Sequence, residues 1–423
     1  MRDILITVMV FGTIPYIFKR PWVGILVWSW LSYMNPHRLA YGFAYDMPFA
    51  QIIAIVLFVS LILSKEKLSF PRHWIIPIWI FFIVWMGITT IFAYFPDLAW
   101  GQYKKIFKIQ LLTFLVLLLI NDMQKMRYLI WTIVVSIGFY SVKGGIFTIL
   151  TGGSGRVWGP PGGFIEENNT LAIAILMIIP LMIFLYQTTE KKWIRNCLLV
   201  SIILSFFTVL GSQSRGALIA IGVVGLFYWK ESGRKIISGI LIIIFSFILL
   251  AFMPESWYQR METIKTYQED SSAMGRLNAW EYAVKAANDN FFGVGLDSWS
   301  PETFLLYAPN PVDVHAAHSI YFSVLADHGW IGLFLFLIIF GGTWMVLSRL
   351  SKETKNNEGF REIHLLAKLL KVSIIAYLSG GAFLSLSYFD LPWNIVAIVI
   401  LLNEYYRKNE KAMVLNKKGS LNY

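Results

Sequence analysis

Residues 315–332 read HAAHSIYFSVLADHGWIG, and this stretch marks the point where a polar interval gives way to an apolar segment. The polar interval covers residues 253–317, and long apolar runs lie on both sides of it. The junction itself carries His318. A histidine there lies where a membrane meets water, so the stretch predicts a membrane protein with one large polar loop and a titratable base at one bilayer surface.

The composition excludes an ordinary soluble protein. The chain has 423 residues, of which 57% are hydrophobic, 16% aromatic and 14% charged, and its mean hydropathy is +0.61. We therefore expect an all-helical, polytopic membrane protein. The net charge of +11 is scattered between apolar runs, which argues against nucleic-acid binding. The single cysteine, Cys197, excludes an intrachain disulfide and a cysteine-based metal site.

Apolar runs long enough to cross a bilayer, about 20 residues each, occur along most of the chain. The first two are short, and they either span the membrane or form a hairpin that enters part of it, so we expect 12 to 13 transmembrane helices. The predicted segments lie near residues 4–18, 22–34, 48–64, 74–95, 105–120, 128–149, 169–187, 194–210, 214–229, 234–252, 319–348, 370–388 and 391–406.

Lysine and arginine alternate between successive loops, which predicts the orientation of the chain, because cytoplasmic loops carry an excess of positive charge. The basic loops lie near residues 65–72, 125–127, 191–195, 230–235, 349–371 and 407–418. The remaining loops are then on the outer side, at 35–47, 96–104, 150–168, 211–214, 253–318 and 388–391. The chain divides into N-terminal transmembrane helices (1–252), an outer loop with short helices (253–318), C-terminal transmembrane helices (319–406) and a cytoplasmic tail (407–423).

The outer loop is too long for a turn and too short for an independent core, so we expect it to rest on the membrane domain. Residues 272–287, SAMGRLNAWEYAVKAA, have apolar side chains at helical spacing, and NDNFFGVG at 288–295 then predicts a turn. Residues 256–270, SWYQRMETIKTYQED, predict a second, amphipathic helix along the interface.

Two arginines on the outer side break the charge rule. Arg215 lies in GSQSRGALIAIGVVG at 211–225, where small neighbours leave room for a ligand at the start of an apolar helix. Arg156 lies in the glycine-rich stretch TGGSGRVWGPPGGF at 151–164, which is suited to present N–H groups and a guanidinium to a phosphate. A snorkelling charge and a flexible connector are the alternative interpretations.

Two further cations are candidates for the same anion site. Arg276 lies near the start of the predicted helix 272–287, where the helix dipole adds to its attraction for anions. Lys143, in SVKGGIF, is near an outer helix end and is predicted to line the same cavity. Lys104, Lys105 and Lys108 also violate the charge rule. They are explained equally well as ligands of the anion site and as contacts to lipid headgroups.

His318 has the strongest claim to act as a general base, because imidazole titrates near neutrality. His315 and His328 are its competitors, and the adjacent Ser319 is a candidate for a supporting role. Asp313, Asp327 and Asp390 are alternative carboxylates to orient the imidazole. The outer segments contain no HExxH motif and no second metal-spaced pair of histidines, so we expect neither a metal nor another cofactor.

These features together resemble the O-antigen ligase and Wzy polymerase superfamily of bacterial membrane glycosyltransferases. The matching pieces are SRGALIA at 214–220, the long outer loop, and the pattern of His318–Ser319, nine residues and Gly329. The N-terminal third, with MRDILIT and RPWVGILVWSWLSYMNPHRLAYGFAYDMPFA, is similar to putative O-glycosylation ligases that occur with exosortase systems.

The resemblance implies a GT-C-like fold in the bacterial inner membrane, with the active site facing the periplasm. It implies transfer of a preassembled glycan from undecaprenyl diphosphate to an acceptor hydroxyl, without metal or nucleotide sugar. His318 is then the base, and Arg215, Arg276 and Arg156 bind the diphosphate. The acceptor, whether lipid A core, protein or another glycan, stays open, and we expect membrane lipids as the other contacts. Attack opposite the leaving group implies inversion at the anomeric carbon.

Two other functions remain open on the sequence. A Wzy-type polymerase joins one lipid-linked repeat to another, and only the resemblance of the N-terminal third favours a ligase. A transporter of lipid-linked oligosaccharides belongs to a different class, and such proteins commonly have repeated halves. This sequence shows no such repeat, and its unusual charges gather at one surface.

Overall fold

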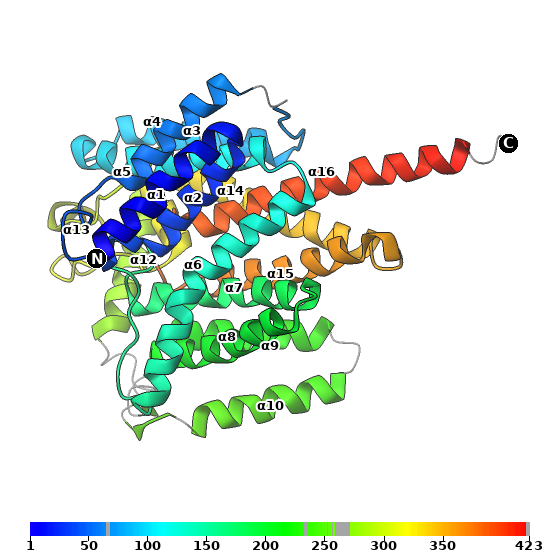
Figure 1. Cartoon of the computed structure of the whole chain (residues 1–423). Helices are drawn as coiled ribbons and strands as arrows, with labels where there is room; N and C mark the ends of the chain where they lie inside the picture. Colours follow the sequence, from blue (N-terminus) through cyan, green and yellow to red (C-terminus); the bar gives the residue numbers. More distant parts are fainter. Residues whose placement is uncertain (65–67, 232–234, 252, 256, 259–270, 420–423) are drawn as a thin grey trace.

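The computed structural model describes residues 1–64, 68–231, 235–251, 253–255, 257–258 and 271–419. Within these ranges the regular structure is helical, which confirms the predicted all-α class (Figure 1). Helices α1 (Arg2–Lys19), α2 (Trp22–Met34), η1 (Pro36–Leu39), α3 (Phe49–Leu63), α4 (Ile75–Ile91), α5 (Pro96–Leu119), α6 (Met123–Leu150), α7 (Asn168–Thr188), α8 (Lys192–Gly211), α9 (Arg215–Glu231) and α10 (Lys235–Ala251) come first. They are followed by α12 (Ser271–Asp289), α13 (Pro301–Tyr307), α14 (Ile320–Glu353), η2 (Glu358–Phe360), α15 (Arg361–Gly381) and α16 (Asp390–Gly419).

Each of the thirteen predicted segments coincides with a helix, and the bounds differ most where charged residues extend a helix. Helix α15 begins nine residues before the predicted segment 370–388, and α16 continues past the predicted 391–406. Within the predicted segment, the buried Lys371 has its ammonium nitrogen over the rings of Trp344 (4.8 Å) and Phe227 (5.4 Å). Aromatic faces thus accommodate a charge within the helix.

Among the described residues, five helical stretches are long and apolar enough to cross a membrane. They are α6, α7, α8, α14 and Glu358–Gly381, which combines η2 and α15. Helix α7 is the most buried of them, and it packs against α6, α8, α9 and α15. Its almost wholly apolar sequence therefore fits a position at the centre of the bundle.

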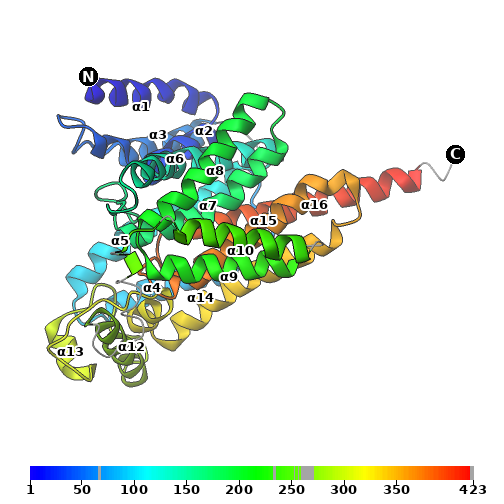
Figure 2. The same ribbon diagram turned by 90° about the horizontal axis from the view of Figure 1, so that it is seen from below.

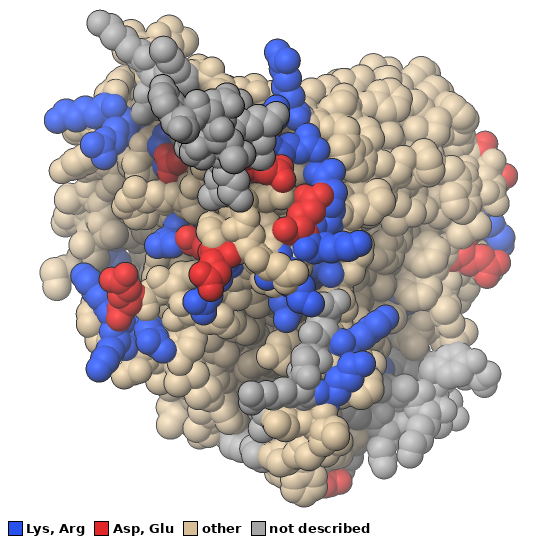
Figure 3. Space-filling view, turned by 90° about the vertical axis from the view of Figure 1, so that its right-hand side faces the viewer, with Lys and Arg blue, Asp and Glu red and all other residues tan. Residues whose placement is uncertain are grey.

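The helices run between two opposite ends of the molecule (Figures 1 and 2). Helices α12 and α13 lie at one end, which we call the α12 end, together with the N-terminus of the chain (Figures 1 and 2). Helix α16 extends from the opposite end, where Lys and Arg side chains gather (Figure 3). The loop residues 290–318, next to α12, therefore lie away from this basic face.

From Ser271 onward, the described part of the outer loop packs against α14, as its length predicts. Helix α12 reproduces the predicted helix 272–287, and a small core of Ala279, Tyr282 and Ala283 packs with Ala326 of α14. The helical spacing of apolar residues 273, 277, 280, 284 and 287 predicts a different buried face, since Leu277 is 43% exposed in the structure. The helix predicted at 256–270 lies outside the described residues except for Trp257 and Tyr258.

The backbone conformation of residue 329 explains why the histidine motif ends in a glycine. It interrupts α14 with φ 66° and ψ −172°, a left-handed conformation that favours glycine. A Cβ at this position would lie 2.6 Å from the carbonyl oxygen of Phe291. The loop that follows α12 crosses α14 there, and the N–H of Val294 donates to the carbonyl of Ala326 (2.8 Å). Gly329 thus allows the polar loop to dock.

Replacing this glycine is expected to destabilise the protein. Gly329→Ala adds a clash with backbone atoms to a strained φ, a combination that costs about 1–3 kcal/mol from the backbone strain alone. Thermal unfolding in detergent should show a lower midpoint for this variant. Gly341→Ala, on the same helix with open space around its Cβ, is the control and should leave the midpoint unchanged or higher. Equal midpoints for the two variants would contradict the role of Gly329.

Candidate functional site

His318 lies in the backbone turn that leads into α14. Its φ of 43° is left-handed, and Ser319 then adopts extended backbone as the N-cap of the helix. The turn is anchored by Trp280 of α12, whose Nε1–H donates to the carbonyl of Ala317 (2.8 Å). The indole also stacks on Phe322, with ring centroids 4.8 Å apart. Helix α12 therefore positions the histidine.

The surroundings of His318 favour the neutral imidazole. Burial lowers its pKa below the usual 6.5, the positive charge of Arg276 lowers it further, and His315 has a smaller effect in the same direction. Glu167 opposes them and raises the pKa. The side chain is half-buried. At neutral pH the ring is then mainly unprotonated, which is the form that accepts a proton.

Glu167 is the acidic neighbour of His318 that sequence reasoning missed. It is exposed and immediately precedes α7, about 150 positions before the histidine in the chain. Its only signal in the sequence was its place in the predicted outer loop 150–168, which also holds Arg156. The three aspartates proposed to orient the imidazole have other partners, described below.

Arg276 lies in the second turn of α12, on the part of the helix that faces residues 315–318. A Cβ at the adjacent Gly275 would be 2.4 Å from the ring of His315. Trp280, one turn further along α12, holds the Ala317 carbonyl. The structure therefore brings together Arg276 and His318, two residues that the sequence placed at one surface.

Arg215 begins α9, and small side chains surround it. The side chain of Ser214 accepts a hydrogen bond from the N–H of Ala217 (3.2 Å), which caps the first turn of the helix. A Cβ at Gly216 would lie 3.2 Å from Cβ of Phe383, and the Phe383 ring centroid is 6.3 Å from that of Trp280. Phe383 therefore lies between the start of α9 and Trp280 of α12. The small residues of the motif also serve packing, since Ala217 is fully buried.

Arg156 is exposed and joins its glycine-rich loop to the turn before α9. Its Nε–H donates to Oε1 of Gln213 (3.4 Å), and Nε2 of Gln213 donates to the carbonyl of Gly153 (3.2 Å). Gln213 is two residues before Arg215 and has a left-handed φ of 55°. Arg156 is therefore attached to the turn that carries Arg215. Lys143 is exposed on α6 and lines a cavity with Arg156.

The two competing histidines have defined partners. Nε2 of His315 lies 2.8 Å from Oδ1 of Asp313, and the histidine is exposed. His328 is fully buried, with Nδ1 2.7 Å from Oγ1 of Thr89 and Nε2 2.9 Å from the hydroxyl of Tyr388. The Tyr388 hydroxyl donates in turn to Asp327 (2.7 Å). His328 and Asp327 therefore belong to a buried network that ties α14 to α4 and to the segment before α16.

The two remaining candidates lie in different environments. Asp390, the first residue of α16, accepts a hydrogen bond from Ser32 of α2 (2.6 Å). Ser319 is buried, and its hydroxyl has no hydrogen-bond partner among the described residues.

Within the described ranges of the chain, no group of three or more His, Cys, Asp and Glu side chains is arranged to hold a metal ion. The residues around His318 are instead cations, a carboxylate and a hydroxyl. Such a set can bind an anionic group and accept a proton from a hydroxyl.

Two family models match the chain. Residues 1–190 match a family of unknown function, DUF5935, and residues 200–337 match the O-antigen ligase family. No curated protein gives a match to this chain. The second match contains Arg215, Arg276 and His318, and it supports a place for the chain in the superfamily of O-antigen ligases and Wzy polymerases. Together with the apolar helices, it supports a multi-pass membrane protein, of which residues 200–337 are similar to the O-antigen ligase family.

Proposed function

We propose that the protein transfers a preassembled glycan from an undecaprenyl diphosphate carrier to a hydroxyl of an acceptor, as an O-antigen ligase does, with His318 as general base. The observation that carries this proposal is the pairing of a half-buried histidine of lowered pKa with Arg276 at the entrance to α14. The match of residues 200–337 to O-antigen ligases supports the same reaction class.

The chemistry follows from the charges of the site. His318 takes the proton of the acceptor hydroxyl while the hydroxyl oxygen bonds to the anomeric carbon. The bond from that carbon to the diphosphate oxygen breaks, and the electron pair leaves with the diphosphate. Arg215, Arg276 and Arg156 stabilise the departing charge, so neither a metal nor a general acid is required. Attack from the face opposite the leaving group inverts the anomeric carbon, and a product linkage of retained configuration would contradict this step.

The proposed orientation places the α12 end in the periplasm and the basic end in the cytoplasm. The gathering of Lys and Arg at the end opposite α12 supports it (Figure 3). The donor diphosphate and the acceptor then meet on the periplasmic side of the bacterial inner membrane. We also propose that most of the thirteen helices cross the bilayer, with the 13-residue α2 too short to span fully at about 1.5 Å per residue.

The direct test is an assay with purified protein in detergent, a defined undecaprenyl diphosphate glycan and separate candidate acceptors. A single glycan block on a lipid A core, protein or glycan acceptor supports the ligase. A lengthening ladder on the carrier identifies a polymerase instead. Absence of any glycan transfer, combined with movement of the carrier in sealed vesicles, would identify a transporter and overturn the proposal.

The two charges that act on His318 predict opposite shifts in the pH profile. Arg276 lowers the pKa of His318, so Arg276→Gln should raise that pKa and move the acidic limb of kcat/KM to higher pH. Glu167 raises the pKa, so Glu167→Gln should move the limb to lower pH. The position of the limb is the measurement, because the height also reflects diphosphate binding. Shifts in the same direction, or no shifts, would contradict His318 as the base.

A further inference from the structure

A cationic groove lies in the N-terminal part of the chain. It has a volume of about 570 Å³ and is lined by Arg2 of α1, Arg38 of η1, Lys143 of α6 and Arg156 of the glycine-rich loop. Its lining residues all fall within residues 1–190, the region that matches the family of unknown function. Four cations on separate segments of the chain thus converge on one space.

The nearest acids do not cancel this charge. Asp46 pairs with Arg38 across 3.3 Å, but its side chain is 86% exposed, so solvent screens the pair strongly. Asp3 accepts hydrogen bonds from the N–H groups of Gly42 and Ala44, and Glu166 accepts one from Gly162. None of these three acids lines the groove. The groove therefore favours a ligand with more than one negative charge.

The side chains of the groove are also held in place. The guanidinium of Arg2 donates to the carbonyl of Leu39 (3.3 Å) and lies 5.7 Å from the ring centroid of Tyr41. The guanidinium of Arg38 lies 4.5 Å from the ring centroid of Tyr45. Such contacts fix the cations without neutralising them. Exposed tyrosines beside cations are typical of the interface between lipid and water.

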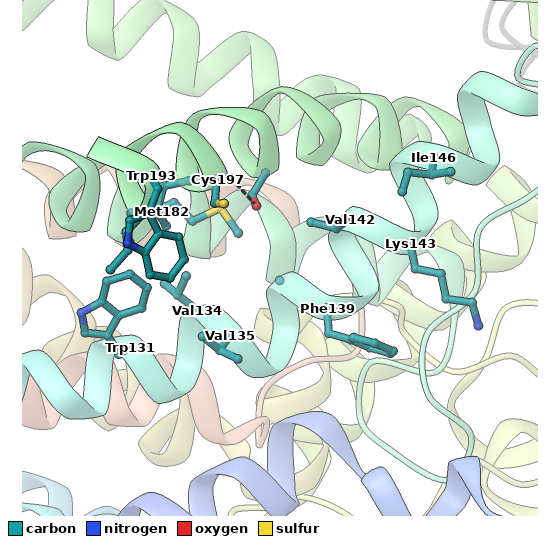
Figure 4. A pocket seen from close by; sticks show the side chains of 14 residues that line it. Trp131, Val134, Val135, Phe139, Val142, Lys143, Ile146, Met182, Trp193 and Cys197 are labelled. Atoms are coloured by element: carbon teal, nitrogen blue, oxygen red, sulfur yellow. Dashed lines mark hydrogen bonds between the residues drawn. The ribbon is translucent and has the colours of Figure 1, made fainter. Parts of the chain in front are cut away.

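An apolar groove meets the cationic groove at Lys143. Its volume is about 810 Å³, and it runs along α6 from Trp131 to Ile146, with α8 and Met182 of α7 as the other walls (Figure 4). At 1.5 Å per residue this stretch of α6 is about 22 Å long, most of the depth of a bilayer core. Lys143 lines both cavities, and its amino group points away from Trp131 and Trp193 (Figure 4).

Helix α6 packs closely against α8 next to Lys143. Beyond Lys143, a Cβ at Gly144 would lie 2.6 Å from the side chain of Thr208, and one at Gly145 would lie 2.3 Å from the carbonyl of Leu204. The two helices are therefore in close contact beside Lys143. A hydrocarbon chain in this groove would have its headgroup directed past Lys143 to the cationic groove.

We infer that the two grooves form a loading site for the polyprenyl diphosphate donor, with the isoprenoid chain along α6 and the diphosphate among Arg2, Arg38, Lys143 and Arg156. The inference rests on the proposed function, since it describes how its donor reaches the site of transfer. Four cations match a diphosphate better than the single charge of a phosphodiester headgroup, which favours the donor over a common phospholipid.

The loading site is connected to the proposed site of transfer by Arg156. This residue lines the cationic groove and contacts Gln213 in the turn before Arg215. The same loop then continues to Glu167, which acts on His318. A diphosphate that moves from Lys143 toward Arg215 thus remains near Arg156. The region of unknown function supplies the loading site, and the O-antigen ligase region supplies the base.

The test measures binding and turnover separately. Undecaprenyl diphosphate without glycan is titrated in detergent into the full-length protein and into Arg2→Gln, Lys143→Gln and Val135→Trp, which fills the apolar groove. Each variant should weaken binding about tenfold, and the two charge variants should raise the KM for the donor while kcat changes little. Lys19→Gln, at the exposed far end of α1, and Val84→Trp on α4 are matched controls outside both grooves and should bind as the unmodified protein does.

The other outcomes overturn the inference. Equal binding of undecaprenyl diphosphate and phosphatidylglycerol would identify a general anionic-lipid site. Unchanged binding and KM in all three variants of folded protein would exclude a loading site, even if glycan transfer proceeds. If the protein binds the lipid through these residues but transfers no glycan, the loading site stands and the proposed function fails. Thermal unfolding of each variant shows whether a loss of binding reflects a loss of fold.

Discussion

His318→Ala should reduce glycan transfer about 100- to 10,000-fold, the usual contribution of a general base, while binding of the lipid-linked donor is retained. The physical reason is that the neutral imidazole at the start of α14 accepts the acceptor's proton in the transition state, whereas donor binding depends on the arginines. The measurement is single-turnover transfer by purified protein at saturating donor, together with direct binding of undecaprenyl diphosphate.

The backbone at this position supplies a sharper variant. The φ of His318 is 43°, and asparagine is enriched in this left-handed region. His318→Asn therefore keeps the turn with less strain than alanine and removes the base. Both variants should be inactive. His315→Ala is the matched control, because His315 is exposed and pairs with Asp313, and it should retain most of the activity. Transfer by folded His318→Asn at the rate of the unmodified protein would contradict the role of His318 as general base.

Arg215→Gln should lower kcat/KM for the donor about 100- to 1,000-fold, the loss typical of removing one group that stabilises developing negative charge. The departing diphosphate gains charge as the glycan leaves, and Arg215 at the start of α9 is proposed to bind it. Transfer rates over a range of donor concentrations give this ratio. An unchanged dependence on donor concentration would remove Arg215 from the diphosphate site.

Two companion variants separate charge from geometry at this position. Arg215→Lys keeps the positive charge but loses the planar, two-pronged donor set, so it should recover only part of the activity. Arg195→Gln is the control. Arg195 lies near the N-terminal end of α8, away from Arg215, and stacks on Tyr186, so its removal should leave kcat/KM unchanged. Equal loss in Arg195→Gln and Arg215→Gln would indicate a general effect of net charge.

The helices and their order could be predicted because apolar runs are a local property of the sequence. Each of the thirteen predicted segments coincides with a helix, even where the bounds shifted. The start of α15 shifted across the charged residues Arg361, Glu362 and Lys368. Inside the helix, the burial of Lys371 depends on the rings of Trp344 and Phe227 from other helices. A hydrophobic run contains no information about such partners.

The motif from His318 to Gly329 was visible in the sequence, but its physical meaning depends on the fold. Gly329 is required where the loop after α12 crosses α14, about 35 positions away from that loop in the chain. The same packing placed His328 in a buried network with Thr89 and Tyr388, and left His318 half-buried beside Arg276.

The sequence by itself determined that this is an all-helical chain of membrane-like composition with a histidine and arginines at the ends of apolar segments, because those properties follow from residue type and spacing. Only the tertiary structure decided the partners: Glu167 beside His318, Asp390 with Ser32, and Lys143 between an apolar and a cationic groove. The physical reason is that such contacts join residues far apart in the chain, and the packing of helices sets which of them meet.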